Sequence, residues 1–164
     1  MVVTLVQADA ETMEAAVAGD AALARHLGCA VEPDWVSFAG ALVAMRDQLA
    51  RDPGAATWGT RLFLAGDPAA LVGWGGYKGP PADGVVELGY EIASGRWGQG
   101  LATAATHAMV AEAFADPRVT AVIAHTLAEP NASNRVLEKA GFRFDRPEVE
   151  DGVDVWRFRL DRPA

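Results

Sequence analysis

Residues 97–103 have the sequence Trp97-Gly98-Gln99-Gly100-Leu101-Ala102-Thr103. They lie between a predicted strand, residues 85–92, and a predicted helix that continues to about residue 115. Glycines at such a junction let a phosphate approach the backbone, where successive amide groups and the helix dipole attract an anion. The stretch therefore predicts an anion site at the start of a helix, although an isolated G-x-G pair is more often only a tight turn.

The surroundings of this stretch exclude two common nucleotide-binding folds. A Rossmann fingerprint needs G-x-G-x-x-G after the first strand of a parallel βαβ series, whereas this stretch lies mid-chain and lacks the third glycine. A Walker A loop needs a terminal Gly-Lys-Ser/Thr, which is also missing. An anion site here must belong to another fold.

Hydrophobic periodicity on either side of the stretch predicts alternating strands and helices. Strands are predicted at residues 2–6, 58–64, 71–77, 85–92, 119–127, 142–144 and 153–160. Helices are predicted at residues 9–19, with Asp9 as N-cap, and at 35–49, 101–115 and 131–140. Short glycine- and proline-rich breaks favour an antiparallel meander over residues 58–92. The fold class is therefore α/β, a mixed sheet of about seven strands flanked by about four helices.

Length and composition predict one domain, residues 1–164, because 51% apolar residues supply a single core. Fourteen basic and 22 acidic residues give a net charge of −8 without any Lys/Arg run, which argues against nucleic acid and anionic membranes as partners. The sequence shows neither a signal-peptide pattern nor an apolar run long enough to span a bilayer, so we expect a cytoplasmic protein.

Cysteine and histidine usage gives no sign of a metal site. Cys29 is the single cysteine, which excludes an internal disulfide and a cysteine-based zinc site. The three histidines, His26, His107 and His125, have no metal-ligand spacing along the chain. We therefore expect no metal.

Four segments in this order resemble the GNAT superfamily of acyl-CoA-dependent N-acyltransferases, in particular the branch of the ribosomal-protein alanine N-acetyltransferases. They are ELGYEI (Glu87 to Ile92), WGQGLAT (Trp97 to Thr103), HTLAEPN (His125 to Asn131) and RVLEKAGF (Arg135 to Phe142). The resemblance covers about residues 85–144 and implies the GNAT fold with acetyl-CoA as co-substrate. It implies that a primary amine, from a small molecule or a protein N-terminus, attacks the acetyl group directly in a ternary complex. It also implies that the protein is a monomer or a homodimer. A GNAT-like domain that binds CoA without catalysis, as a sensor or scaffold, is the alternative.

The resemblance also implies where CoA binds. Backbone amides of the glycine-rich stretch hold the pyrophosphate, and pantetheine pairs with the strand that ends at Ile92. The family pattern begins with Gln or Arg, where this chain has Trp97. Asn131 and Asn134 are further candidates, with helix capping as their alternative role. The predicted cofactor residues are Ile92, Trp97, Gly98, Gln99, Gly100, Leu101, Ala102, Thr103, Asn131 and Asn134.

Amine acetylation needs a base that takes the amine proton and an acid for the leaving thiolate. Glu87 and Glu91 alternate onto the same face of one strand, whereas Tyr90 alternates to the other face and is predicted in the core. The resemblance favours Glu87 as the base, although an exposed sheet face is the alternative for both glutamates. The family's usual acid, a tyrosine, is replaced by Leu137, and Ser133 is a weaker catalytic candidate.

Candidates for the acceptor site are the aromatic residues Trp35, Phe38 and Trp74, because the second helix and the meander flank the cleft in this fold. For each aromatic residue, core packing is the alternative. His125, at the end of a strand that enters the cleft, is a fourth candidate.

Overall fold

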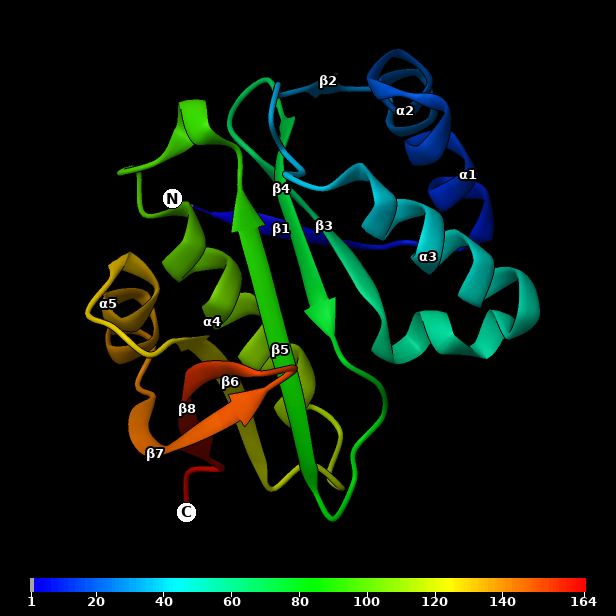
Figure 1. The fold of residues 1–164 in the computed structure, drawn as a ribbon. Coiled ribbons are helices and arrows are strands. Elements are labelled where there is room, and N and C mark those ends of the chain that lie inside the picture. Colours follow the sequence, from blue (N-terminus) through cyan, green and yellow to red (C-terminus); the bar gives the residue numbers. More distant parts are fainter. Residues whose placement is uncertain (1) are drawn as a thin grey trace.

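The computed structural model describes residues 2–164 and contains, within them, one eight-stranded sheet with the order β1-β3-β4-β5-β6-β8-β7, while β2 pairs with β4 (Figure 1). The strands are β1 (Val3–Gln7), β2 (Ala30–Val31), β3 (Thr60–Ala65), β4 (Ala70–Tyr77), β5 (Val85–Ile92), β6 (Ala121–Leu127), β7 (Arg143–Glu150) and β8 (Val153–Asp161). The helices are α1 (Ala10–Ala18), α2 (Asp20–Leu27), α3 (Ala39–Arg51), α4 (Leu101–Phe114) and α5 (Ala132–Lys139), with 3-10 turns η1 (Pro53–Trp58) and η2 (Ser94–Arg96).

The two faces of the sheet carry separate hydrophobic cores. Helices α4 and α5 cover one face, where Met109 and Leu137 pack with Phe63 and other buried residues. Helices α1, α2 and α3 cover the other, where Leu42 packs in the cluster that contains Leu62 (Figure 1). Leu62 and Phe63 are neighbours on β3 and belong to opposite cores, because successive strand residues point to opposite faces.

The structure confirms the fold class and the main connections predicted from the sequence. Strands β3, β4 and β5 form the antiparallel meander, and β5-α4-β6 is a parallel crossover. Asp9 caps α1, since its carboxylate accepts a hydrogen bond from the amide of Thr12 at 2.8 Å. No helix within residues 2–164 is long and apolar enough to cross a membrane.

Two elements were missed between residues 19 and 35. Gly19, with φ +128°, ends α1 and lets the chain begin α2 immediately, and β2 then follows. The next helix, α3, begins at Ala39 and not at residue 35 as predicted, because Trp35 is buried and donates a hydrogen bond to Asp20 at 3.0 Å. The spacing of Trp35 therefore reflects tertiary packing and not a helical turn.

The last strand pair is longer than predicted. The sequence indicated only residues 142–144, but β7 continues to Glu150 and pairs with β8 along most of its length. Most of β7 is exposed and charged, so hydrophobic alternation gave no signal, and cross-strand hydrogen bonding determines the strand instead.

Strands β5 and β6 pair over three residues only and then part. The pairs run from Val85 with Ala121 to Glu87 with Ile123, so residues 88–92 have no partner on the β6 side. An unpaired strand edge offers amide and carbonyl groups to a ligand. This opening lies beside the turn that leads into α4 (Figure 1).

Candidate active site

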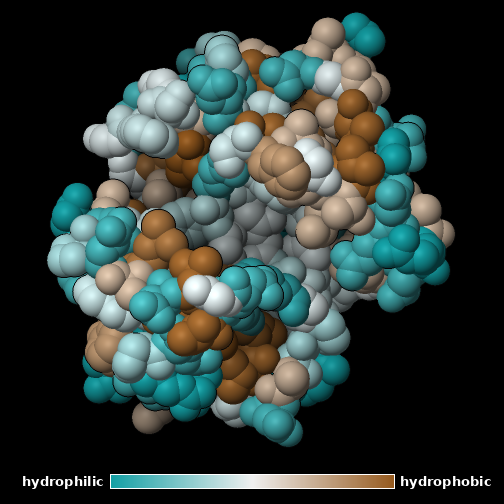
Figure 2. All heavy atoms as spheres, viewed as in Figure 1, coloured by the Kyte–Doolittle hydropathy of each residue, from teal (hydrophilic) through white to brown (hydrophobic). Residues whose placement is uncertain are grey.

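Two cavities meet on β5. The larger, about 570 Å³, lies between the end of β5, the turn before α4 and helix α5. The smaller, about 250 Å³, lies over β4 and β5, where Gly89 leaves open space in place of a side chain, and Met45 of α3 forms part of its wall. In the space-filling view the molecule is hollowed near its centre, over these strands (Figure 2). Tyr90 and Glu91 line both cavities.

The turn before α4 has the geometry of an anion site. Gly98 and Gly100 both have φ +77°, a left-handed conformation that favours glycine. The amide of Ala104 donates to the carbonyl of Gly100 at 3.0 Å, so the amides of residues 101–103 precede that first bond of the helix. A Cβ atom at Gly98 or Gly100 would meet no atom within 4 Å, so the space beside this backbone is open. Of the predicted cofactor residues, Ile92, Trp97, Gly98, Gly100, Leu101, Ala102 and Thr103 line the larger cavity.

Trp97, which stands where the family pattern has Gln or Arg, is 71% exposed, and its indole Nε1 donates a hydrogen bond to the carbonyl of Ile92 at 2.9 Å. This bond ties the turn to the end of β5. Gln99 does not line the cavity; its amide oxygen accepts a hydrogen bond from Arg96 at 3.3 Å.

The larger cavity also contains three basic residues that the sequence analysis did not single out: Arg96, Arg135 and Lys139. The positions of Arg135 and Lys139, four residues apart in α5, place them on the same helix face. That spacing was a usable signal in the sequence. The three cations give the cavity a positive wall in a chain whose net charge is −8.

Tyr90 was predicted in the core; it packs against the core under α4 and α5, and it also lies where the two cavities meet. Its hydroxyl donates to the carbonyl of Ser133 at 3.4 Å, which brings β5 and the start of α5 together. Burial raises the pKa of the Tyr90 phenol, although the Ser133 contact opposes the shift, so the phenol keeps its proton at neutral pH. Glu91 accepts a hydrogen bond from the indole of Trp74 at 3.0 Å.

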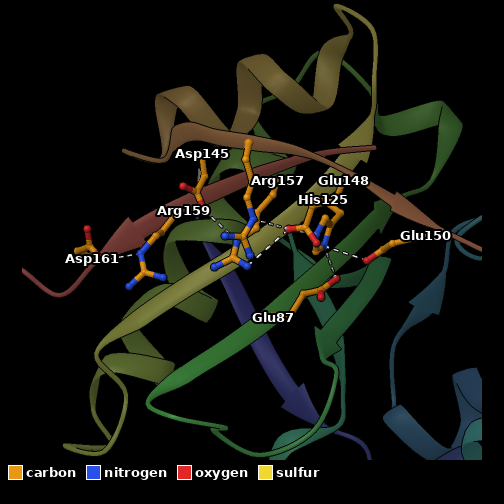
Figure 3. A network of polar contacts seen from close by, with 9 residues as sticks. Glu87, His125, Asp145, Glu148, Glu150, Arg157, Arg159 and Asp161 are labelled. Atoms are coloured by element: carbon orange, nitrogen blue, oxygen red, sulfur yellow. Dashed lines mark hydrogen bonds and ion pairs between the residues drawn. The ribbon is translucent and has the colours of Figure 1, made fainter. Parts of the chain in front are cut away.

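Glu87 is the last β5 residue that pairs with β6, at the point where the strands part. Its Oε2 lies 2.6 Å from Lys78 Nζ and 3.0 Å from His125 Nδ1. His125 also faces two carboxylates of β7, Glu148 and Glu150 (Figure 3). Burial raises the pKa of Glu148, but a hydrogen bond from Arg146 and the nearby imidazole of His125 outweigh that effect and hold the pKa below its usual value.

Several predicted site residues lie outside both cavities. Trp35 is buried in the core under α1–α3, and Phe38 is 72% exposed at the start of α3. Asn131 caps α5 through the amide of Asn134 at 3.0 Å. Asn134 is buried, where its side chain donates to the carbonyl of Glu129 and accepts from Thr126. Structural contacts therefore occupy both asparagine side chains.

The remaining candidates lie in three places: the two cavities, the parting of β5 and β6, and the hydrophobic core. Ser133 lines the larger cavity and Trp74 the smaller one. Glu87 and His125 line neither, and lie together at the parting of β5 and β6. Leu137, at the position of the usual tyrosine, is buried in the core under α4 and α5.

The sequence matches the family described as Acetyltransferase (GNAT) domain over residues 1–143. The chain belongs to this family. It is accordingly an acyl-CoA-dependent acetyltransferase, which confirms the enzyme class and superfamily expected from the motifs. Among curated proteins, none matches the chain.

Several acetyltransferases of known structure have the same fold as this chain. A GNAT-family acetyltransferase from Bacillus anthracis is 17% identical, with 98% of this chain and 95% of that chain covered and a TM-score of 0.67. The aminoglycoside acetyltransferase AAC(6')-Ib with coenzyme A is 18% identical, with the same coverages and a TM-score of 0.67. A spermidine N-acetyltransferase chimera of Vibrio cholerae SpeG and hSSAT is 15% identical, with 98% and 96% covered and a TM-score of 0.67.

Proposed function

We propose that this acetyltransferase binds acetyl-CoA in the larger cavity and a primary amine in the smaller one, and transfers the acetyl group directly between them. The observation that carries the proposal is that Tyr90 and Glu91 line both cavities. Two ligands that occupy adjoining cavities can react without a covalent enzyme intermediate, because the protein fixes their distance and orientation.

The donor contacts follow from the shape and charge of the larger cavity. The turn at Gly98–Gly100 and the first amides of α4 hold the pyrophosphate, and the basic side chains on its wall contribute further attraction for phosphate. Pantetheine lies along residues 88–92 of β5, whose edge toward β6 is unpaired. Its thioester then points toward Glu87, where the two strands meet.

Glu87 is the proposed base, acting directly or through a water molecule. It is 17% exposed and stands at the closed end of the opening between β5 and β6. Glu91 shares its face of the strand, so both carboxylates are directed to the acceptor side. Tyr90 is the proposed acid for the leaving thiolate, since Leu137 has no proton to give and the Tyr90 phenol is protonated at neutral pH.

The acceptor is proposed to be a cationic amine. Glu91 lines the smaller cavity, and Glu87, Glu148 and Glu150 gather nearby on β5 and β7 (Figure 3). The fold relatives named above include an aminoglycoside and a spermidine acetyltransferase, whose acceptors carry several amines. The resemblance to ribosomal-protein alanine N-acetyltransferases keeps basic protein N-termini as a second candidate class. Peptide, polyamine, amino-sugar and amino-acid acceptors therefore form the panel to test.

The single-domain organisation expected from the sequence also remains a proposal. The family match ends at residue 143, and β7 and β8 follow it. Both strands pair into the same sheet through β6, which supports one domain over residues 1–164.

Calorimetry with acetyl-CoA, followed by thiol release with that amine panel, tests the proposed function. We expect acetyl-CoA binding and faster thiol release with at least one cationic amine, with the acetylated product identified by mass spectrometry. Binding without acceleration by any amine in the panel would support the sensor or scaffold alternative. Absence of acetyl-CoA binding would contradict both.

Tyr90→Phe tests the proposed acid. Removal of the hydroxyl leaves the ring in place, so we expect kcat to fall about tenfold, below the usual range for acid catalysis because a thiolate leaves readily. Acetyl-CoA affinity and the KM of the acceptor should change little. Ser133→Ala tests the other candidate separately, because it removes the Ser133 hydroxyl and keeps the backbone carbonyl that Tyr90 contacts. A wild-type kcat in Tyr90→Phe would show that the thiolate leaves without this proton.

A further inference from the structure

A buried imidazole lies among three carboxylates where β5 and β6 part (Figure 3). The side chain of His125 is 8% exposed. Within residues 2–164, no group is oriented to form a hydrogen bond with either of its ring nitrogens. Oε2 of Glu87 also has no hydrogen bond, although it lies in ion-pair contact with Lys78 and His125. Buried polar atoms nearly always have a hydrogen-bond partner. The two ring nitrogens of His125 lack one, which indicates that a ligand binds here.

We propose that Glu87, His125 and Glu150 bind one divalent transition-metal ion of the Zn²⁺ class. Each residue offers one ligand atom, and the three atoms lie within 4.8 Å of one another. His125 Nδ1 is 3.0 Å from Glu87 Oε2 and 3.2 Å from Glu150 Oε1. Tetrahedral ligands with bonds of about 2.1 Å lie roughly 3.4 Å apart, so a small outward movement of the carboxylates opens the site.

Glu148 supplies the second part of such a site. Its Oε1 is 3.5 Å from His125 Nε2, on the side of the ring away from Glu87 and Glu150 (Figure 3). The negative charge of Glu148 beside Nε2 favours the imidazole tautomer with its proton on Nε2, which leaves the lone pair of Nδ1 for a metal. Arg146 and Arg157 lie 3.3 and 3.5 Å from the same oxygen and hold Glu148 in place.

The ligand types determine which metals fit. One imidazole and two carboxylates suit Zn²⁺, Co²⁺ and Ni²⁺ better than Mg²⁺ or Ca²⁺, which prefer oxygen alone. Lys78, now beside Glu87, is 59% exposed and can move into solvent when a divalent cation replaces its charge. The metal would then engage the carboxylate proposed as base, so binding would inhibit acetyl transfer; this consequence rests on the proposed function, whereas metal binding does not.

Calorimetric titration of the full chain with Zn²⁺ tests the site, with Co²⁺ as a spectroscopic probe. We expect one ion per chain, ligand-field absorption from Co²⁺, and much weaker binding of Mg²⁺ and Ca²⁺. His125→Ala and Glu150→Gln should each weaken Zn²⁺ binding at least ~10- to 100-fold, because mutation of even a residue that only supports a metal ligand typically costs that much. His107→Ala is the matched control, since His107 is exposed on α4. Glu150 is 41% exposed, so Glu150→Gln should fold even if His125→Ala does not.

Two results would overturn the metal site: no stoichiometric Zn²⁺ binding, or stoichiometric binding that Glu150→Gln leaves as tight as in the wild type. Acetyl transfer is the second measurement, and we expect Zn²⁺ to inhibit the wild type at concentrations where Glu150→Gln is unaffected. Stoichiometric binding without inhibition would leave the metal site in place and count against Glu87 as the base. The two proposals can therefore fail separately.

Discussion

Gly100→Glu should weaken acetyl-CoA binding by roughly one to three orders of magnitude, because it places a negative charge where the pyrophosphate is proposed to lie. Two unit charges about 4 Å apart repel by ~1 kcal/mol in water and ~4 kcal/mol near a protein surface. Each 1.4 kcal/mol corresponds to a tenfold change in the dissociation constant. Calorimetry with acetyl-CoA measures the effect directly.

Two control variants separate charge from backbone strain. Gly100 has φ +77°, so Gly100→Ala carries the strain without the charge and should cost about 1 kcal/mol of stability. Gly95→Glu adds the same charge at a nearby exposed turn, outside the cavity and with open space for a side chain. It should leave acetyl-CoA affinity unchanged. A folded Gly100→Glu variant with wild-type affinity would show that the cofactor phosphates lie elsewhere.

Glu87→Gln should lower kcat by more than tenfold and up to the ~10²- to 10⁴-fold typical of a lost general base. The change keeps the size of the side chain and removes its ability to take the proton of the amine. The acid limb of the pH profile should flatten in the variant, because the titrating carboxylate is gone. Acetyl-CoA affinity should remain close to the wild type, since Glu87 lies outside the larger cavity.

Glu91→Gln is the matched control, because Glu91 lies four residues after Glu87 on the same face of β5. It should have the smaller effect on kcat, although Glu91 lines both cavities and holds the indole of Trp74. A large loss in Glu91→Gln with a wild-type Glu87→Gln would assign the base to Glu91. Full activity in both variants would mean that water or the thiolate accepts the proton.

Local features of the chain were sufficient to predict most of the fold. Alternation along residues 85–92 predicted β5 with its correct bounds, and the glycines of residues 97–103 predicted the turn before α4. Both signals depend on contacts within a few residues, which the sequence contains directly. The helix α2 was missed because the break at Gly19 permits an immediate second helix, which periodicity alone does not reveal.

The candidate site was predictable only in part. The turn and the two glutamates follow from local pattern. The position of Tyr90 beside both cavities was missed, because strand alternation specifies which face a residue occupies and not what covers that face. In the structure β5 and β6 part beyond Glu87, and the resulting opening exposes Tyr90 to both cavities. Aromatic spacing misplaced Trp35 for the same reason, since burial under α1–α3 is a tertiary contact.

The sequence by itself determined the α/β class and the glycine turn at Gly98–Gly100, because backbone conformation and strand alternation are encoded in neighbouring residues. The GNAT fold followed from the resemblance of four motifs and was confirmed by the family match. Only the tertiary structure brought Glu87 of β5, His125 of β6 and Glu150 of β7 together. These residues are far apart in the chain and carry no common spacing. Their meeting depends on where β5 and β6 part and on how β7 pairs with β8, and long-range strand pairing sets both.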